Sequence, residues 1–288
     1  MRTRATAGNI IFALAVMGLG IISLATDRFA SVWEPVPKGL PARHAFAYAN
    51  GVVMLLLGAG LLRRRARVRA AFLLTGFFVL WFILLHIPIV VAAPGSAGAW
   101  SGFGECGTLI VGAMLVFAGA TSQGDGPRPG FLTGARGIGL ARVVFALAAF
   151  LMSLGNLAYL RANADFPPAW IPHWMGWGYL VGLGFIATGL AVLCRTLPRL
   201  ATYVAAWMMT LLTLGCWVSF VIEAPGSRVN WTGLMISSAI AGAGWLLAET
   251  YGNDPWLALS WRPAGGRADS QAPAPAGIGQ SVTPTRDE

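Results

Sequence analysis

The sequence predicts an all-α integral membrane protein with eight transmembrane helices, arranged as two four-helix repeats of parallel orientation. The composition is typical of a protein embedded in a membrane: 56% of the 288 residues are hydrophobic and only 11% are charged, whereas an average soluble domain has about 25% charged residues. The mean hydropathy is +0.67. The formal net charge is +9. In a membrane protein, an excess of basic residues mainly reflects which side of the membrane each loop occupies, so we do not interpret it as a sign of nucleic-acid binding.

Eight apolar stretches are each near the length of about 20 residues that a helix needs to cross the hydrocarbon core. They lie at residues 9–26, 45–62, 70–93, 103–120, 138–160, 174–194, 200–222 and 232–250. We expect a first membrane unit over 1–122, a cytoplasmic linker over 123–137, a second membrane unit over 138–252 and a cytoplasmic tail over 253–288. The tail is rich in Pro, Gly, Ala and Ser, so we predict that it is disordered.

The basic residues predict the topology. Assigned loop by loop, 15 of the 20 Lys and Arg residues fall on one side of the predicted membrane, including the cluster Arg63–Arg69. The positive-inside rule then places both termini in the cytoplasm of an integral plasma-membrane protein, as an even number of spans requires. The Arg63–Arg69 cluster has a second interpretation, in which it binds an anionic lipid headgroup or an acidic partner.

The second half of the chain reproduces the first at an offset of 131 residues. Ala93–Ser96 matches Ala224–Ser227, and Trp100 matches Trp231. Four spans return the chain to its starting side, so the two units should be parallel, related by an axis along the membrane normal. The first stretch also has an internal counterpart at 144–160, so we interpret it as a mature helix rather than a cleaved signal peptide.

Ionisable side chains within membrane spans are costly, which makes them functional candidates. His86 falls in the outer part of the third span, and Glu105, Cys106 and Thr108 lie near the outer start of the fourth. A histidine and a carboxylate at one depth could share a proton, and such a pair could exchange a proton with a quinone or handle a proton for transport. The alternative is structural: Glu105 faces water at a helix end, and His86 bonds a backbone carbonyl.

The first external loop carries Trp33, Pro35 and Pro37, and His44 follows where the second span begins. Proline stiffens such a segment, and tryptophan anchors it at the headgroup layer. We consider these four residues a candidate lid over an external pocket, with an architectural re-entry loop as the alternative. The second unit has a similar loop, Phe166–Pro172.

The repeat provides an internal control, because the polar set is confined to the first unit. His86 aligns with Trp217, Glu105 with Ile236, Cys106 with Ser237, and His44 with Met175. The pattern is expected if one half holds a site and the other half packs against it.

The three cysteines, Cys106, Cys194 and Cys216, show no C-x-x-C and no zinc spacing, so we expect no metal site and no disulfide framework. A dithiol site would require Cys106 and Cys216 to meet. The alternative is that both are small buried apolar side chains.

The first unit resembles the DoxX-like membrane proteins. The resemblance lies in residues 33–41, Tyr48–Gly51, Gly58–Leu62, the Arg run and a third helix that contains His86. It implies a polytopic bacterial membrane protein, in a family where some members resemble subunits of quinone-linked oxidoreductase systems; it carries over no catalytic residue. The doubled length departs from the single four-helix pattern.

Three functions remain open at this point. The first is a quinone-linked subunit or accessory protein of a membrane redox system, with a quinone as cofactor and other redox proteins as partners. The second is a non-catalytic membrane scaffold, and the third is a small-solute or proton-coupled transporter. The helices lack the paired Gly/Pro interruptions typical of many midplane transport sites.

Overall fold

The computed structural model describes residues 5–30, 33–122, 130–159, 170 and 173–259, and all regular secondary structure within them is helical. The chain runs through α1 (Ala7–Thr26), α2 (Arg43–Leu62), α3 (Arg67–Trp81), η1 (Phe82–His86), α4 (Ile87–Ala92), α5 (Ala97–Thr121), α6 (Gly134–Tyr159), α7 (Trp174–Cys194), α8 (Pro198–Leu212), η2 (Thr213–Trp217), α9 (Val218–Glu223) and α10 (Arg228–Glu249). The elements η1 and η2 are single π-helical turns.

Eight helices of the described chain are long and apolar enough to cross a membrane, and each coincides with a predicted stretch. The third and seventh spans, Arg67–Ala92 and Pro198–Glu223, run through a π turn without a break. The prediction of an all-α integral membrane protein with eight spans is confirmed.

The largest difference in helix bounds is at α5, which begins at Ala97 rather than near residue 103. The Ser96 side chain caps this helix by accepting a hydrogen bond from the backbone N–H of Ala99 at 3.2 Å. Ser227 caps α10 in the same way, through the N–H of Asn230 at 3.3 Å. A serine cap satisfies one of the free N–H groups at a helix start, so both helices extend further than hydropathy alone indicates.

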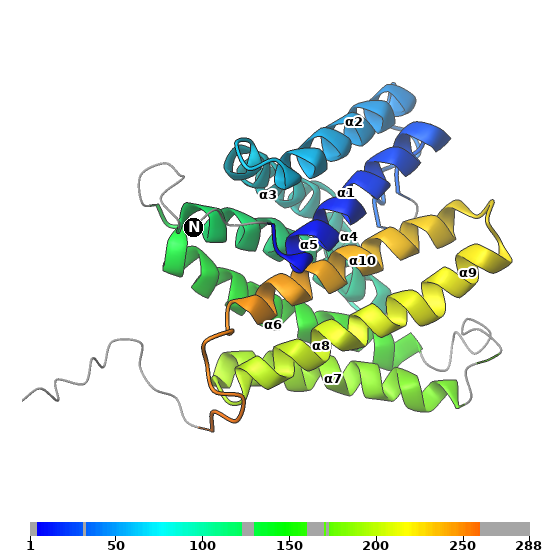
Figure 1. Cartoon of the computed structure of the whole chain (residues 1–288). Helices are drawn as coiled ribbons and strands as arrows, with labels where there is room; N and C mark the ends of the chain where they lie inside the picture. The colour runs from blue at the N-terminus through cyan, green and yellow to red at the C-terminus, as the bar shows by residue number, and fades with distance from the viewer. Residues whose placement is uncertain (1–4, 31–32, 123–129, 160–169, 171–172, 260–288) are drawn as a thin grey trace, which may run out of the picture.

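The two central helices are α5 and α10, the most buried of the eight spans, and they pack against each other. Helix α1 lies along α10, and α6 lies along α5 (Figure 1). Glycines permit this close approach: a Cβ on Gly242 of α10 would lie 2.7 Å from the backbone nitrogen of Phe12, and one on Gly104 would lie 2.7 Å from the carbonyl oxygen of Ala148. The first helix of each predicted unit therefore packs on the last helix of the other.

The bounds of the elements recur at the same offset as the sequence. The series α3, η1, α4 and the start of α5 reappears 131 residues later as α8, η2, α9 and the start of α10. Trp100 donates from its indole to the carbonyl oxygen of Pro94, and Trp231 donates to that of Pro225, both at 2.8 Å. These matches accord with a duplicated unit, whose parallel arrangement stays a prediction.

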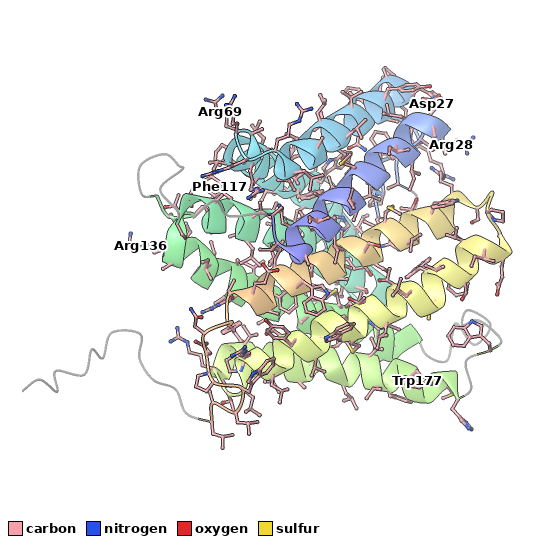
Figure 2. The ribbon with its side chains drawn as sticks, viewed as in Figure 1. Asp27, Arg28, Arg69, Phe117, Arg136 and Trp177 are labelled. Atoms are coloured by element: carbon pink, nitrogen blue, oxygen red, sulfur yellow. The ribbon has the colours of Figure 1, made fainter. Side chains whose placement is uncertain are left out.

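The bundle has two distinct ends. Arg69 and Arg136 lie at one end, and Asp27 and Arg28 lie at the other (Figure 2); we call the latter the loop end, because the segment 27–42 that joins α1 to α2 begins there. At the opposite end, Leu197 donates its N–H to the carbonyl oxygen of Ala258 at 2.8 Å, which holds the chain after α10 against the start of α8. The predicted linker core at 123–129 and the tail from 260 onward lie outside the described residues.

Candidate functional site

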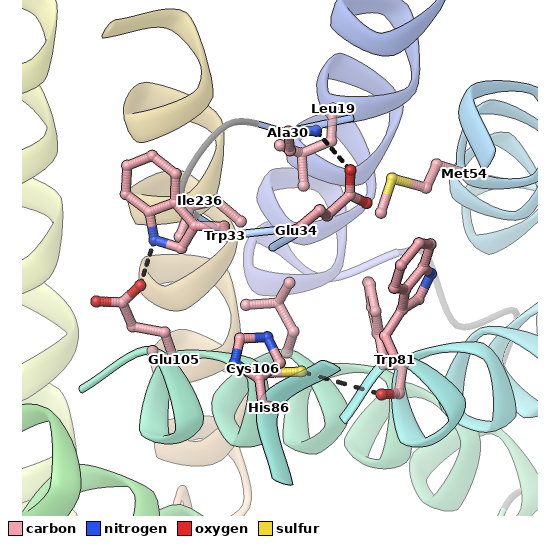
Figure 3. Close-up of a pocket in the computed structure, with 13 residues that line it drawn as sticks. Leu19, Ala30, Trp33, Glu34, Met54, Trp81, His86, Glu105, Cys106 and Ile236 are labelled. Atoms are coloured by element: carbon pink, nitrogen blue, oxygen red, sulfur yellow. Dashed lines mark hydrogen bonds between the residues drawn. The ribbon is translucent and has the colours of Figure 1, made fainter. Parts of the chain in front are cut away.

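A pocket lies at the loop end, between the loop residues Ala30, Trp33 and Glu34 and the elements α1, α2, α3, η1, α5 and α10. Its cavity volume is about 30 Å³, which is room for about one or two waters. The walls are mostly apolar, but they include several side chains able to exchange or bond a proton (Figure 3). The lining residues are Leu19, Ala30, Trp33, Glu34, Met54, Phe78, Trp81, His86, Gly102, Glu105, Cys106, Leu109 and Ile236.

Glu105 reaches the pocket from the first half of α5 and bonds to the loop above it. The indole N–H of Trp33 donates to Oε2 of Glu105, and the hydroxyl of Ser101, one turn earlier on α5, donates to Oε1 at 3.3 Å. Figure 3 shows the indole bent from the loop toward this carboxylate. Glu105 is therefore a half-buried acceptor that bonds the loop through Trp33 and its own helix through Ser101.

A second carboxylate, Glu34, comes from the loop itself and is 7% exposed. It accepts hydrogen bonds from the backbone N–H of Ala30 at 2.5 Å and from the amide of Asn50 on α2 at 3.0 Å. Burial raises the pKa of Glu34 to about 7, although both hydrogen bonds act to lower it. The loop thus carries an acid that changes its charge near neutral pH.

Glu34 was not among the residues singled out from the sequence. It stands between a tryptophan and a proline in an external loop, where a solvated carboxylate is the ordinary expectation. The available signal was Asn50, a polar residue within an otherwise apolar span, which is 4% exposed and needs a buried partner.

His86 ends the π turn η1 and is 6% exposed. Its imidazole lies beside Gly102 of α5, where an added Cβ would make an ordinary contact with the ring at 3.7 Å, and its polar neighbour is the backbone of Trp33. In α4, Pro88 follows the turn and has no N–H to donate; at the same place in the second unit, Ser219 instead bonds the carbonyl oxygen of Gly215 at 2.7 Å. Pro88 and the bonded Ser219 each disturb the regular i to i−4 hydrogen bonds of the helix, and this disturbance accounts for the π turn in each half.

Cys106 and Thr108 lie on different faces of α5. Cys106 lines the pocket, and its thiol lies 3.9 Å from the carbonyl oxygen of Phe78. Thr108 is fully buried away from the pocket, with its hydroxyl bonded to the carbonyl oxygen of Gly104 at 3.0 Å and 3.8 Å from the sulfur of Met152. The structure therefore brings His86, Glu105 and Cys106 together, and places Thr108 in the contact with α6.

Of the four candidate lid residues, only Trp33 lines the pocket. Pro35 and Pro37 belong to the same loop but lie outside the lining, Pro37 being exposed. His44 is 73% exposed, and its Nδ1 lies 2.5 Å from a carboxylate oxygen of Asp27 at the rim of the bundle. Of the corresponding loop in the second unit, only Trp170 is described; it donates from its indole to the hydroxyl of Ser219 at 3.2 Å.

Two of the aligned residues of the second unit lie at or near the same pocket. Ile236, the counterpart of Glu105, is one of the lining residues. Trp217, the counterpart of His86, lies so close over Gly233 that a Cβ there would be 2.0 Å from its ring, and it meets the Trp33 ring edge to face at 6.0 Å between centroids. The first half thus supplies all the polar groups of the pocket and most of its apolar wall, and the second half adds Ile236.

The three cysteines are free thiols, so Cys106 and Cys216 form no disulfide here. No group of three His, Cys, Asp or Glu side chains able to hold a metal ion occurs among the described residues. The chemistry available at the pocket is therefore that of two carboxyl groups, one imidazole, one thiol and the indole N–H groups of Trp33 and Trp81 around a space of about 30 Å³.

Comparison with known proteins finds no matching family, no curated relative and no solved structure similar to this chain.

Proposed function

We propose that this chain is a DoxX-like membrane protein that serves a quinone-linked redox system as a subunit or accessory protein. The observation that carries the proposal is the convergence of Glu34, Glu105 and His86 in one pocket of an apolar bundle, lined in part by the loop. Buried ionisable groups are costly in a membrane and occur mainly where a proton or ligand is handled. A quinone ring needs such groups, because its oxidised and reduced forms differ in bound protons.

The size of the pocket sets a condition on this function. A cavity of about 30 Å³ accommodates water, whereas even a benzene ring occupies a cavity of about 150 Å³. A ring can enter only where a lining side chain leaves. Trp33 is the candidate for that movement, because it belongs to the loop and not to a helix; Glu105 and His86 would then remain on their helices to bond and orient the ring.

We place the loop end on the outer side of the plasma membrane and both termini in the cytoplasm. The support is the distribution of basic residues, with the Arg63–Arg69 cluster and Arg136 at the opposite end of the bundle (Figure 2). In this orientation the pocket lies at the level of the outer leaflet, and we expect protons exchanged there to come from the external side.

The test is mass spectrometry of lipid extracts from gently purified protein. We expect a stoichiometric quinone with the wild type, and its loss from the double variant His86→Ala with Glu105→Gln. Glu223→Gln is the matched control, because Glu223 is an exposed glutamate at the loop end of α9. Absence of quinone from wild type and variants alike would overturn the proposal and favour a scaffold role.

A further inference from the structure

The indole of Trp33 is oriented unlike that of a typical tryptophan at a membrane boundary. Such residues usually keep the N–H toward water or headgroups and the ring toward lipid. Trp100 and Trp231 approach this arrangement, since both are partly exposed and donate to a nearby loop carbonyl. Trp33 instead directs its N–H into the protein, to a carboxylate on a central helix.

The space that holds this indole has the shape and chemistry of a site for a flat ring. One wall is the Trp217 ring, which meets the indole edge to face; such aromatic pairs add specific attraction to burial. Ile236 lies beside it (Figure 3). At the end of the space, Glu105 accepts the single polar hydrogen of the ring.

We infer that Trp33 occupies, as a built-in substitute, a slot for a planar ring that bears a hydrogen-bond donor, and that the ligand of this protein takes its place against Trp217 and Glu105. The ligand is then of the phenol or hydroquinone class. In its ionised form a carboxylate only accepts hydrogen bonds, so a ring that offers carbonyl or ether oxygens alone leaves the ionised Glu105 without its partner. This inference rests on the proposed function for the type of ligand, and adds that the reduced form binds.

The hydrogen bond to Glu105 should make the site bind rings with a donor more tightly than rings of the same shape without one. A hydrogen bond to an ionised acceptor is stronger than one between neutral groups, and an acceptor that loses its donor is left unpaired. A ring with a donor should therefore bind at least about tenfold more tightly than an isosteric ring without one.

The experiment uses the full chain with Trp33→Ala, in which the slot is vacated, and measures binding by equilibrium dialysis. The probes are indole and benzofuran, which share size and shape but differ in the N–H. We expect indole to bind at least about tenfold more tightly than benzofuran, and the preference to disappear when Glu105→Leu is added. Hydroquinone should compete with indole, whereas its dimethyl ether should not.

Trp170→Ala is the matched control, because Trp170 is the loop tryptophan of the second unit and its indole bonds Ser219 instead of a carboxylate. It should show no preference for indole. Equal binding of indole and benzofuran to a folded Trp33→Ala protein, or binding of neither, would overturn the inference.

A measurement on the wild type covers the case in which Trp33→Ala does not fold. In protein labelled with ¹⁵N-tryptophan, hydroquinone should shift the indole resonance of Trp33, identified by its absence from Trp33→Phe, and the dimethyl ether should not. An unmoved resonance at saturating hydroquinone contradicts the inference. The two proposals fail separately: a co-purified quinone without indole preference refutes only the slot, and indole preference without any quinone refutes only the redox role.

Discussion

Glu34 offers the sharpest quantitative test of the site, through the substitution Glu34→Gln. The glutamine keeps an oxygen that can accept from the N–H of Ala30, and it remains next to Asn50, so it imitates the protonated acid. What it removes is the ability to ionise inside the loop. The pH dependence of stability should therefore change while the fold does not.

The magnitude follows from the pKa. Burial raises the pKa of Glu34 from 4.5 to about 7, and a shift of one unit corresponds to about 1.36 kcal/mol. Between these two values the folded chain binds more protons than the unfolded chain, so the free energy of unfolding falls as the pH rises. The stabilisation is complete below pH 4.5 and is lost as the pH passes 7, an upper limit of about 3 kcal/mol for the whole change.

The assay is chemical unfolding in mixed micelles at several pH values from 4.5 to 8, for wild type, Glu34→Gln and the exposed control Glu223→Gln. The wild type and the control should lose stability across this interval, and Glu34→Gln should lose about 3 kcal/mol less. Parallel curves for wild type and Glu34→Gln would falsify the argument, because they would show that Glu34 ionises as freely in the fold as outside it.

Three further predictions concern the rest of the chain. Gly242→Ala should destabilise the bundle by about 1–3 kcal/mol, because the added Cβ would meet backbone atoms of α1, whereas Gly119→Ala, with nothing within 4 Å, should not; unfolding in mixed micelles measures both. Arg142→Gln should loosen the chain after α10, since it removes the guanidinium hydrogen bonds to Thr250 and the stacking on the Tyr251 ring, and limited proteolysis should then cut near residue 252 faster than in wild type. With the other two cysteines replaced by serine, the exposed Cys194 at the end of α7 should react with an impermeant maleimide only after cells are permeabilised; labelling of intact cells would contradict the proposed orientation.

The sequence was sufficient for the spans because each is set by the length of an apolar stretch, a property that does not depend on the neighbours. The first residues of α5 and α10 could not be predicted from hydropathy, since Ser96 and Ser227 extend these helices through capping hydrogen bonds that hydropathy does not reflect. For the site, the sequence showed that His86 and Glu105 lie within or beside apolar stretches, where burying an ionisable side chain is costly.

The sequence did not show which residues of the loop would face the pocket. Whether Trp33 and Glu34 face water or the bundle depends on their partners Glu105 and Asn50, which lie on other helices. Thr108 shows the converse limit: it is one turn from Gly104 and two residues from the pocket-lining Cys106, yet its hydroxyl faces α6. Position along a helix sets the depth of a side chain, and only the packing of the other helices sets its direction.

The packing of α1 on α10 and of α6 on α5 has a consequence for how the molecule is assembled. The two halves of the chain pack on each other through α1, α5, α6 and α10, so we expect neither half to form a separate folded body. If the chain is cut between α5 and α6, the two pieces should remain associated through the faces of α5 and α10. Ribosomal synthesis delivers α1 long before α10 exists to receive it, and α1 must wait in the bilayer beside α2. Ile236 of the pocket lining, and Trp217 that packs on Trp33, are synthesised with the last two spans, so the pocket is completed only when translation is nearly finished.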